Sequence, residues 1–343
     1  MSPQIANGAE PRILIDQALE KRYTSRMTSA NTFTPAAEAT IRDVIVRWSQ
    51  LVEQAAGVLD RGSLDAIRIA EFQAAARRVI ELSRDCPDAA LFVLIQMAAG
   101  ELVHYSARHA LLCALVAELC ARRLEWAEPE IESLVCAALT MNIAMTHLQN
   151  TLARQLSPLT AEQRQAVNGH AARSAELLKA AGVIDPLWLE VVLRHHEADP
   201  LPQVQPPLAQ RMAHLLRRVD LYTAKLSRRA GRHPRSPAIA ARDACLNSAG
   251  LPDAVGATLL NVLGLYPPGC YVALANGDTA VVIARGAHAH GPVAAALRRA
   301  DGTDYESPVR RDTLLQEFEV LRSLPLVTSR LQHGLAAILG ALP

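Results

Sequence analysis

The amino-acid sequence predicts a mainly α-helical protein with a small β unit near its C-terminus. Half of the 343 residues are hydrophobic but only 4% are aromatic. The core must therefore be built mainly from Ala, Leu, Val and Ile, a composition that favours close-packed helices. Apolar residues follow helical spacing until about residue 264, and strand-like runs begin only after Tyr266. The length allows two or three domains.

Charge and composition exclude several classes of protein. Lys and Arg total 35 against 34 Asp and Glu, a net charge of +1, whereas nucleic-acid binders normally concentrate positive charge. The N-terminus lacks an apolar signal core, and no apolar run reaches the roughly 18 uninterrupted residues of a membrane span. The six cysteines include no CxxC pair and are predicted to be reduced thiols. We therefore expect a soluble cytoplasmic protein that binds neither nucleic acid nor a membrane.

The first 99 residues are predicted to form a helical module. A short helix is expected over residues 11–21, followed by a linker, and a second helix over 34–59, where apolar residues recur on one face. The pattern continues over 64–83. The Asp-Cys-Pro-Asp run at 85–88 is typical of a helix start with Pro in its first turn. No chemical motif is present, which favours a role in packing or dimerisation.

Two long apolar helices are predicted in the centre of the chain. The first covers residues 101–123, and the second runs from 130 to about 146. The second ends in the sequence Ala-Ala-Leu-Thr-Met-Asn-Ile-Ala-Met at 137–145.

Further helices are predicted between residues 160 and 264 from their start and stop signals. Thr160–Gln163 has the form of a capping box, and its helix stops at Gly182. A helix starts at Asp185-Pro186 and ends near residues 195–197. A Pro-rich connection follows, in which helix is disfavoured. The remaining predicted helices cover 208–230 and short stretches that begin at Ser236-Pro237 and Pro252-Asp253.

The C-terminal part is predicted to contain a β-hairpin. Two strand-like runs, 270–275 and 279–284, are joined through Asn276-Gly277-Asp278, a strong hairpin signal. A third strand is expected over 293–299 and a closing helix over 329–342, which gives a small hairpin or barrel-like extension. These boundaries divide the chain into segments 1–99, 100–264 and 265–343.

Residues 101–249 resemble the HD-GYP branch of the HD phosphohydrolases. The end of the helix at 137–145 is similar to a family helix that ends in His-Asp-Ile-Gly-Lys, and Tyr105–Arg108 stands where the family has His-Ser-x-Arg. The later matches, in chain order, are the segment that ends at His170, the run His195-His196-Glu197, and Asp220. The hairpin resembles a small extension found in many relatives. The resemblance implies an HD-type helical bundle.

The same resemblance shows which family residues are missing. The His-Asp pair falls on Met141 and Asn142, and the first family His falls on Tyr105, with His104 and His109 nearby. The Asp-Gly-x-Gly-Tyr-Pro signature has become Asp-Pro-Leu-Pro at 199–202. Hydrolysis by two metals needs a bridging carboxylate, whereas an amide bridges cations poorly and a thioether is a poor ligand for Mn, Mg or ferrous iron. The resemblance therefore implies a vestigial site, Tyr105, Met141 and Asn142, with no catalytic residue.

Five potential metal ligands remain at family positions: Glu101, His170, His195, His196 and Asp220. The resemblance implies that they converge and hold at most one divalent ion (Fe, Mn or Zn), chiefly through the histidines, although no cofactor is required. The alternative is an inherited structural arrangement, in which the adjacent histidines favour the negative pole of a helix.

Arginines offer a second kind of contact. Arg108, Arg228 and Arg232 are candidate contacts for a phosphate or nucleotide, and the alternative is solvated helix charge. The resemblance favours a non-catalytic regulatory or scaffold protein derived from an HD-GYP phosphohydrolase, in bacterial cyclic-di-GMP signalling. The expected partner is a signalling protein, a cyclic dinucleotide is a candidate ligand, and a homodimer is a candidate assembly. Two alternatives stay open: an active metal-dependent phosphohydrolase or phosphodiesterase with a rearranged site, and a pure protein-interaction module.

Overall fold

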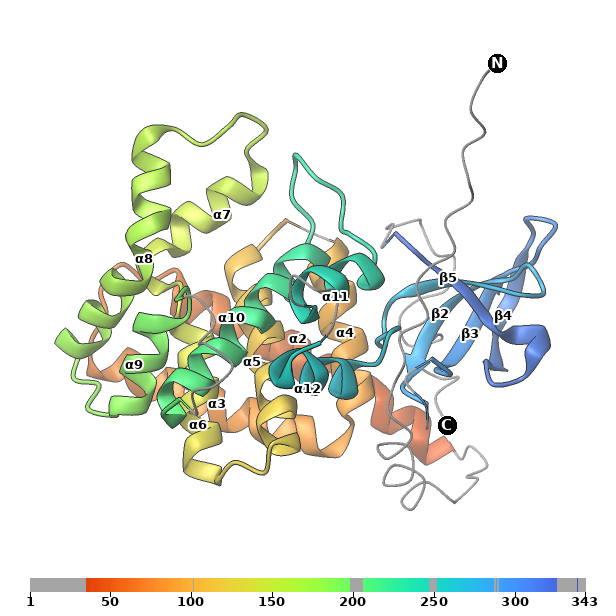
Figure 1. Cartoon of the computed structure of the whole chain (residues 1–343), viewed down its shortest axis with the longest axis horizontal. Helices are drawn as coiled ribbons and strands as arrows, with labels where there is room; N and C mark the ends of the chain where they lie inside the picture. Colours follow the sequence, from red (N-terminus) through yellow and green to blue (C-terminus); the bar gives the residue numbers. More distant parts are fainter. Residues whose placement is uncertain are drawn as a thin grey trace.

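Helices form the body of the protein, and an antiparallel sheet lies at one end of it, opposite α8 and α9 (Figure 1). The computed structural model describes residues 35–100, 102–197, 206–246, 252–286, 288, 290–325 and 338, with 35–42 described by backbone alone. The expected mainly α fold with a small C-terminal β unit is confirmed. The helices are α2 (Pro35–Leu59), α3 (Ala66–Asp85), α4 (Pro87–Gly100), α5 (Tyr105–Arg123), α6 (Glu128–Thr140), the 3₁₀ helix η2 (Ile143–Met145), α7 (Thr146–Arg154), α8 (Ala161–Ala180), α9 (Pro186–Arg194), α10 (Leu208–Leu226), α11 (Pro237–Cys245) and α12 (Ala254–Leu263).

Helix α5 lies at the centre of the body. It packs against α2, α3, α4, α6, α7, α10 and α12, and Leu111, Leu112 and Leu115 are fully buried. A helix surrounded on all sides is apolar all round. Its few polar side chains, His109 and Glu118 among them, are therefore held in the interior, where each needs a partner.

The central helices differ from the sequence prediction at their ends. The first begins at Tyr105 instead of residue 101, after His104, which has a left-handed backbone with φ of 52°; Glu101 lies outside the described residues. The second ends at Thr140 instead of continuing to about 146. Asn142 has φ of −105° and ψ of 13°, a conformation between helix and strand that Asn tolerates well. The apolar run continues past this turn, which explains the overextended prediction.

One stretch, Glu128–Arg154, has the length and apolar character of a membrane span, with a mean hydropathy of 1.3 in its best window. Within the protein, 61% of that window is buried, and the turn at Met141 and Asn142 interrupts the stretch. Core helices of soluble proteins meet the same criterion. The stretch is therefore weak evidence for a membrane span.

The start signals of the later helices are confirmed. Thr160 Oγ1 accepts a hydrogen bond from Gln163 N, and Gln163 Oε1 accepts one from Thr160 N, so α8 has its capping box. Asp185 caps α9, and Asp253 caps α12. Helix α10 ends at Leu226, four residues before the expected end. Most of the Pro-rich connection lies outside the described residues.

The predicted hairpin is the centre of a larger sheet. Its strands are β1 (Tyr271–Leu274), β2 (Thr279–Ala284), β3 (Val293–Arg298), β4 (Asp304–Asp312) and β5 (Val320–Leu324), in the antiparallel order β4-β3-β2-β1-β5. Gly277 occupies the turn with φ of 87°, a conformation that glycine adopts without strain. The hairpin and the third strand are confirmed, and β4 and β5 were not predicted. The expected closing helix lies outside the described residues except Ile338, which is helical and buried.

The sheet packs against α4. Arg285 forms an ion pair with Asp88, and the Gln96 amide donates to Gly269 O at 2.5 Å. Gly269 has φ of 91°, and a Cβ there would lie 3.0 Å from Phe92 O, so glycine permits this close approach. Because α4 joins the sheet to the rest of the helical body, the division into 1–99, 100–264 and 265–343 stays a proposal.

Candidate metal centre

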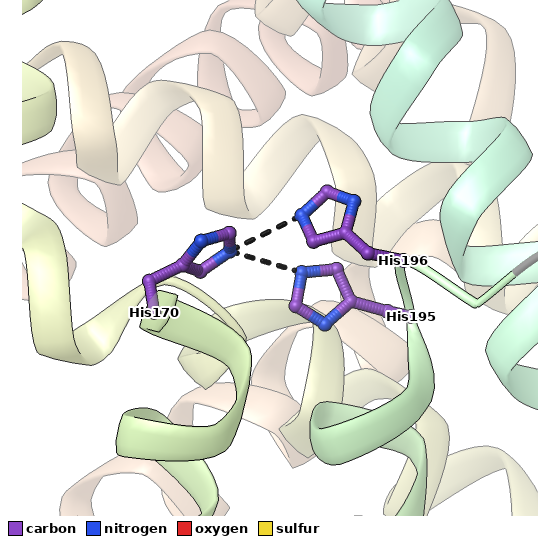
Figure 2. A group of neighbouring side chains, drawn as sticks. All are labelled: His170, His195 and His196. Atoms are coloured by element: carbon purple, nitrogen blue, oxygen red, sulfur yellow. Dashed lines mark hydrogen bonds between the residues drawn. The ribbon is translucent and has the colours of Figure 1, made fainter. Parts of the chain in front are cut away.

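Three histidines from two helices meet at one point. His170 lies on α8, and His195 and His196 follow the last residue of α9. Their rings face one another, and Nε2 of His170 lies 3.2 Å from Nε2 of both His195 and His196 (Figure 2). His170 and His195 are buried, whereas His196 is exposed. The cluster is therefore accessible from the surface on the side of His196.

Backbone carbonyls fix the orientation of two of these rings. Nδ1 of His170 lies 2.5 Å from Val167 O, and Nδ1 of His195 lies 2.7 Å from Val192 O. A carbonyl oxygen only accepts, so each Nδ1 must carry the hydrogen, and each Nε2 presents a lone pair to the centre of the cluster. Lone pairs 3.2 Å apart repel unless a proton or a metal ion lies between them. Metal-binding histidines are oriented in this way, with the second nitrogen donating to a carbonyl or carboxylate.

The protonation of the cluster favours a metal ion over a shared proton. Burial lowers the pKa of His195 to about 3 and also lowers the pKa of His170. Both rings are therefore neutral near pH 7 and available as ligands. Four-coordinate zinc holds imidazole nitrogens at roughly 2.0–2.1 Å, which places two such nitrogens about 3.3 Å apart. The observed 3.2 Å separations thus fit one transition-metal ion.

Asp220 lies beside the histidine cluster but bonds to another residue. Its Oδ1 accepts a hydrogen bond from His109 Nε2 at 2.7 Å, which links α10 to α5. Burial alone would raise the pKa of Asp220, but the bond and charge of His109 outweigh burial and hold that pKa at about 2. His195 and His196 interact with the Asp220 charge as well. The structure thus brings the three histidines together, and Asp220 is bonded to His109.

The sequence prediction missed two residues that surround Asp220. Cys113 Sγ lies 3.7 Å from His109 Nε2 and 3.0 Å from Thr223 Oγ1. One ligand atom from each of His109, Cys113 and Asp220 lies within 4.8 Å of the other two. His109 is four residues after Tyr105, and Cys113 is four residues after His109. This spacing places all three on one face of a helix and is the signal that could have identified them.

The vestigial positions have different surroundings. The Tyr105 ring stacks on His109 with a centroid distance of 5.9 Å, and its hydroxyl accepts from Arg229 Nε at 3.2 Å. Met141 is 1% exposed and packs in the hydrophobic core. Asn142 is half-buried at the turn after α6. Tyr105 therefore belongs to the surroundings of His109.

The turn after α6 is tied to the helix that carries His170. Ala144 N donates to Ser174 Oγ on α8 at 3.2 Å. Trp188 Nε1 on α9 donates to Oγ1 of Thr140, the last residue of α6, at 2.8 Å. Both bonds place the two histidine-bearing helices relative to α6.

The three candidate arginines are engaged within the protein. Arg228 Nη1 donates to Gly100 O at 3.0 Å, and Arg232 Nη2 donates to Ala224 O at 2.7 Å. Arg108 is 8% exposed and also interacts within the fold. The first two hold the segment after α10 in place. A contact of any of the three with phosphate stays a prediction.

Comparisons with known proteins agree with this architecture. The family model described as an HD domain matches residues 92–198, which include α5, α6 and the three histidines. The fold is similar to the solved structure of an HDG"Y"P protein from Bdellovibrio bacteriovorus, with a TM-score of 0.50 and 13% sequence identity over 71% of this chain and 76% of that one. No curated protein matches the sequence. Fold and histidine cluster define an HD-type helical protein. The match of residues 92–198 to an HD domain, together with the HD-type fold, confirms the resemblance of this part of the chain to HD proteins.

Proposed function

We propose that this chain is a non-catalytic regulatory or scaffold protein, derived from an HD-GYP phosphohydrolase, that binds one transition-metal ion. The observation that carries the proposal is the turn after α6. Met141 is buried in the hydrophobic core, and the neighbouring Asn142 carries no charge. Hydrolysis by two metals needs a carboxylate that bridges the ions and activates a hydroxide between them. Neither residue can supply it.

The state of Asp220 supports the same conclusion. Among the described residues, no carboxylate oxygen belongs to the group formed by the three histidines. Asp220 is instead hydrogen-bonded to His109. An ion held by His170, His195 and His196 would therefore have imidazole ligands and open positions for water, but no bridging partner. Such an ion would fix the end of α9 against α8, a structural or sensing role; Fe, Mn and Zn are the candidate metals.

The setting of the proposal comes from the family resemblance. A degenerate HD-GYP relative would act in bacterial cyclic-di-GMP signalling, with a signalling protein as partner, a cyclic dinucleotide as candidate ligand, and a homodimer as candidate assembly. A cytoplasmic location is supported by six cysteines that are all free thiols, as expected in a reducing compartment.

The proposal is tested by hydrolysis of cyclic di-GMP. The purified chain, loaded in separate samples with Mn²⁺, Fe²⁺ or Zn²⁺, should show no turnover above buffer that contains the same metal. Binding of cyclic di-GMP, measured by calorimetry on the same samples, then separates a ligand sensor from a scaffold. Turnover that disappears in both His195→Asn and Asp220→Asn, while the exposed His147→Asn control retains it, would overturn the proposal.

A phosphohydrolase with a rearranged site is the second candidate, because His109 and Cys113 lie beside Asp220. In that case His109 would replace the ligand lost at Tyr105, one helical turn away. This candidate requires turnover in the wild-type chain that His109→Gln abolishes.

A further inference from the structure

We propose that His109, Cys113 and Asp220 form a second metal site, separate from the three-histidine cluster and selective for a thiophilic divalent ion such as Zn²⁺ or Co²⁺. The three residues supply one nitrogen, one sulfur and one oxygen ligand, all within 4.8 Å of one another. Mixed sets of His, Cys and Asp ligands are typical of zinc, and a thiolate disfavours Mg²⁺ and Mn²⁺. Neither His109 nor Cys113 stands at a position that the family resemblance assigns to a ligand.

The backbone presents these ligands rigidly. His109 and Cys113 are four residues apart on α5, so both side chains project from the same face of one helix, and Asp220 approaches from α10. Helix α5 is enclosed by other helices, and His109 and Cys113 are 2% and 0% exposed. Asp220 is partly exposed, with 22% of its side chain accessible, so the site is preformed on α5 and opens to solvent on the side of Asp220. Three protein ligands leave the fourth position of a tetrahedral ion to water.

The separations suit a tetrahedral ion after a small adjustment. Zinc bonds of about 2.3 Å to sulfur and 2.0–2.1 Å to nitrogen place those two atoms about 3.6 Å apart, and Cys113 Sγ lies 3.7 Å from His109 Nε2. The His109 Nε2 to Asp220 Oδ1 distance of 2.7 Å is that of a hydrogen bond. An ion between them would widen this distance by roughly half an ångström.

The hydrogen-bond partners of Cys113 show where its S–H hydrogen lies in the metal-free chain. Thr223 Oγ1 lies 2.9 Å from Val219 O, an acceptor, and thus uses its single hydrogen there. In the metal-free chain Cys113 must then donate its S–H to Thr223 Oγ1. Metal binding replaces this proton, which leaves to solvent, and the resulting thiolate bonds to the ion. The hydrogen on His109 Nε2 must also leave before this nitrogen can bind the ion: a ring protonated on both nitrogens releases it to solvent, and Nδ1 keeps its own hydrogen.

Titration of the metal-free full-length chain with Co²⁺ tests the proposal, because only a thiolate ligand gives cobalt an intense near-ultraviolet charge-transfer band. We expect two equivalents to bind, one of them with this band. Cys113→Ser and Cys113→Ala should each lose the band and one equivalent. Cys120→Ser, which alters a fully buried cysteine on the same helix, should retain both. His170→Asn should lose the other equivalent and keep the band.

Two results would overturn the proposal: saturation of the wild-type chain without a charge-transfer band, or a band that survives in Cys113→Ser. If the Cys113 variants fail to fold, as judged by circular dichroism, a wild-type chain without the band still overturns the proposal, and a band that is retained in Cys120→Ser supports it. The readout is independent of hydrolysis, so its failure leaves the proposed non-catalytic function untouched.

Discussion

The three-histidine cluster and the cluster of His109, Cys113 and Asp220 differ in the hydrogen-bond partner of histidine Nδ1. In the three-histidine cluster, Nδ1 of His170 and of His195 donates to a backbone carbonyl, and the Nε2 lone pairs converge. In the other cluster, Nδ1 of His109 is buried without a hydrogen-bond partner, and Nε2 bonds to Asp220. The first arrangement prepares ligands for a cation, and the second already neutralises an Asp charge within the protein. His170 and His195 are therefore held ready for an ion, whereas His109 must give up its bond to Asp220 before it can bind one.

Metal affinity should differ between the clusters for the same reason. Loss of the partner that orients a metal-binding histidine typically costs 10–100-fold in affinity. The three-histidine cluster should therefore fill first, and the cluster of His109, Cys113 and Asp220 should fill second.

The largest effect is expected from loss of a ligand in the first cluster. His195→Asn should remove the tighter of the two bound equivalents of Zn²⁺, because His195 is fully buried and its Nε2 faces the other two rings. Isothermal titration with elemental analysis measures this loss. The exposed His147→Asn should leave both equivalents in place. Retention of the tighter equivalent in His195→Asn would show that the first cluster is not the metal site.

Removal of metal should have a smaller, global effect. An ion in the first cluster ties α8 to the end of α9, and binding to the folded state alone stabilises it by roughly 2.7 kcal/mol when free metal is at 100 times its dissociation constant. Thermal unfolding should therefore shift to lower temperature in chelator. His195→Asn should show at most a small further shift on chelation. An equal shift in both proteins would place the stabilising ion elsewhere.

The smallest effect is expected from Trp188→Phe. The variant replaces the buried indole with a smaller ring. It removes the bond from Nε1 to Thr140 Oγ1, which contributes about 1 kcal/mol, and the smaller ring leaves a cavity that adds to this loss. Urea unfolding should show this loss, with metal affinity in the first cluster reduced by less than about tenfold. If Trp188→Phe no longer bound the tighter of the two metal ions, the packing of α9 on α6 would determine metal affinity in the three-histidine cluster.

Local signals made much of the fold predictable. The capping box at Thr160, the start at Asp185-Pro186 and the turn at Asn276-Gly277 each depend on a few adjacent residues, and the structure reproduces all three. Strand β4 was missed because its residues are mainly polar and include Pro308. Such a sequence predicts a loop, although proline is compatible with the edge strand that β4 forms.

The site was predictable only where the family resemblance placed a residue. The resemblance grouped His170, His195 and His196, and the structure brings them together. It gave no role to His109, because the bond to Asp220 joins residues 111 positions apart and depends on how α10 packs against α5. The spacing from Tyr105 was visible in the sequence, but spacing alone does not reveal which helix faces that side.

The most direct test of the central claim is a single-turnover assay with protein in excess over cyclic di-GMP, in which even one slow hydrolysis event per site is detected. The wild-type chain, saturated with Mn²⁺ or Fe²⁺, should leave the substrate intact, since Met141 and Asn142 supply no bridging carboxylate. Conversion by the wild-type chain is compared with conversion by a triple variant that reinstates the family ligands: Tyr105→His, Met141→His, Asn142→Asp. Complete conversion by the wild-type chain, abolished by His195→Asn, would contradict the account.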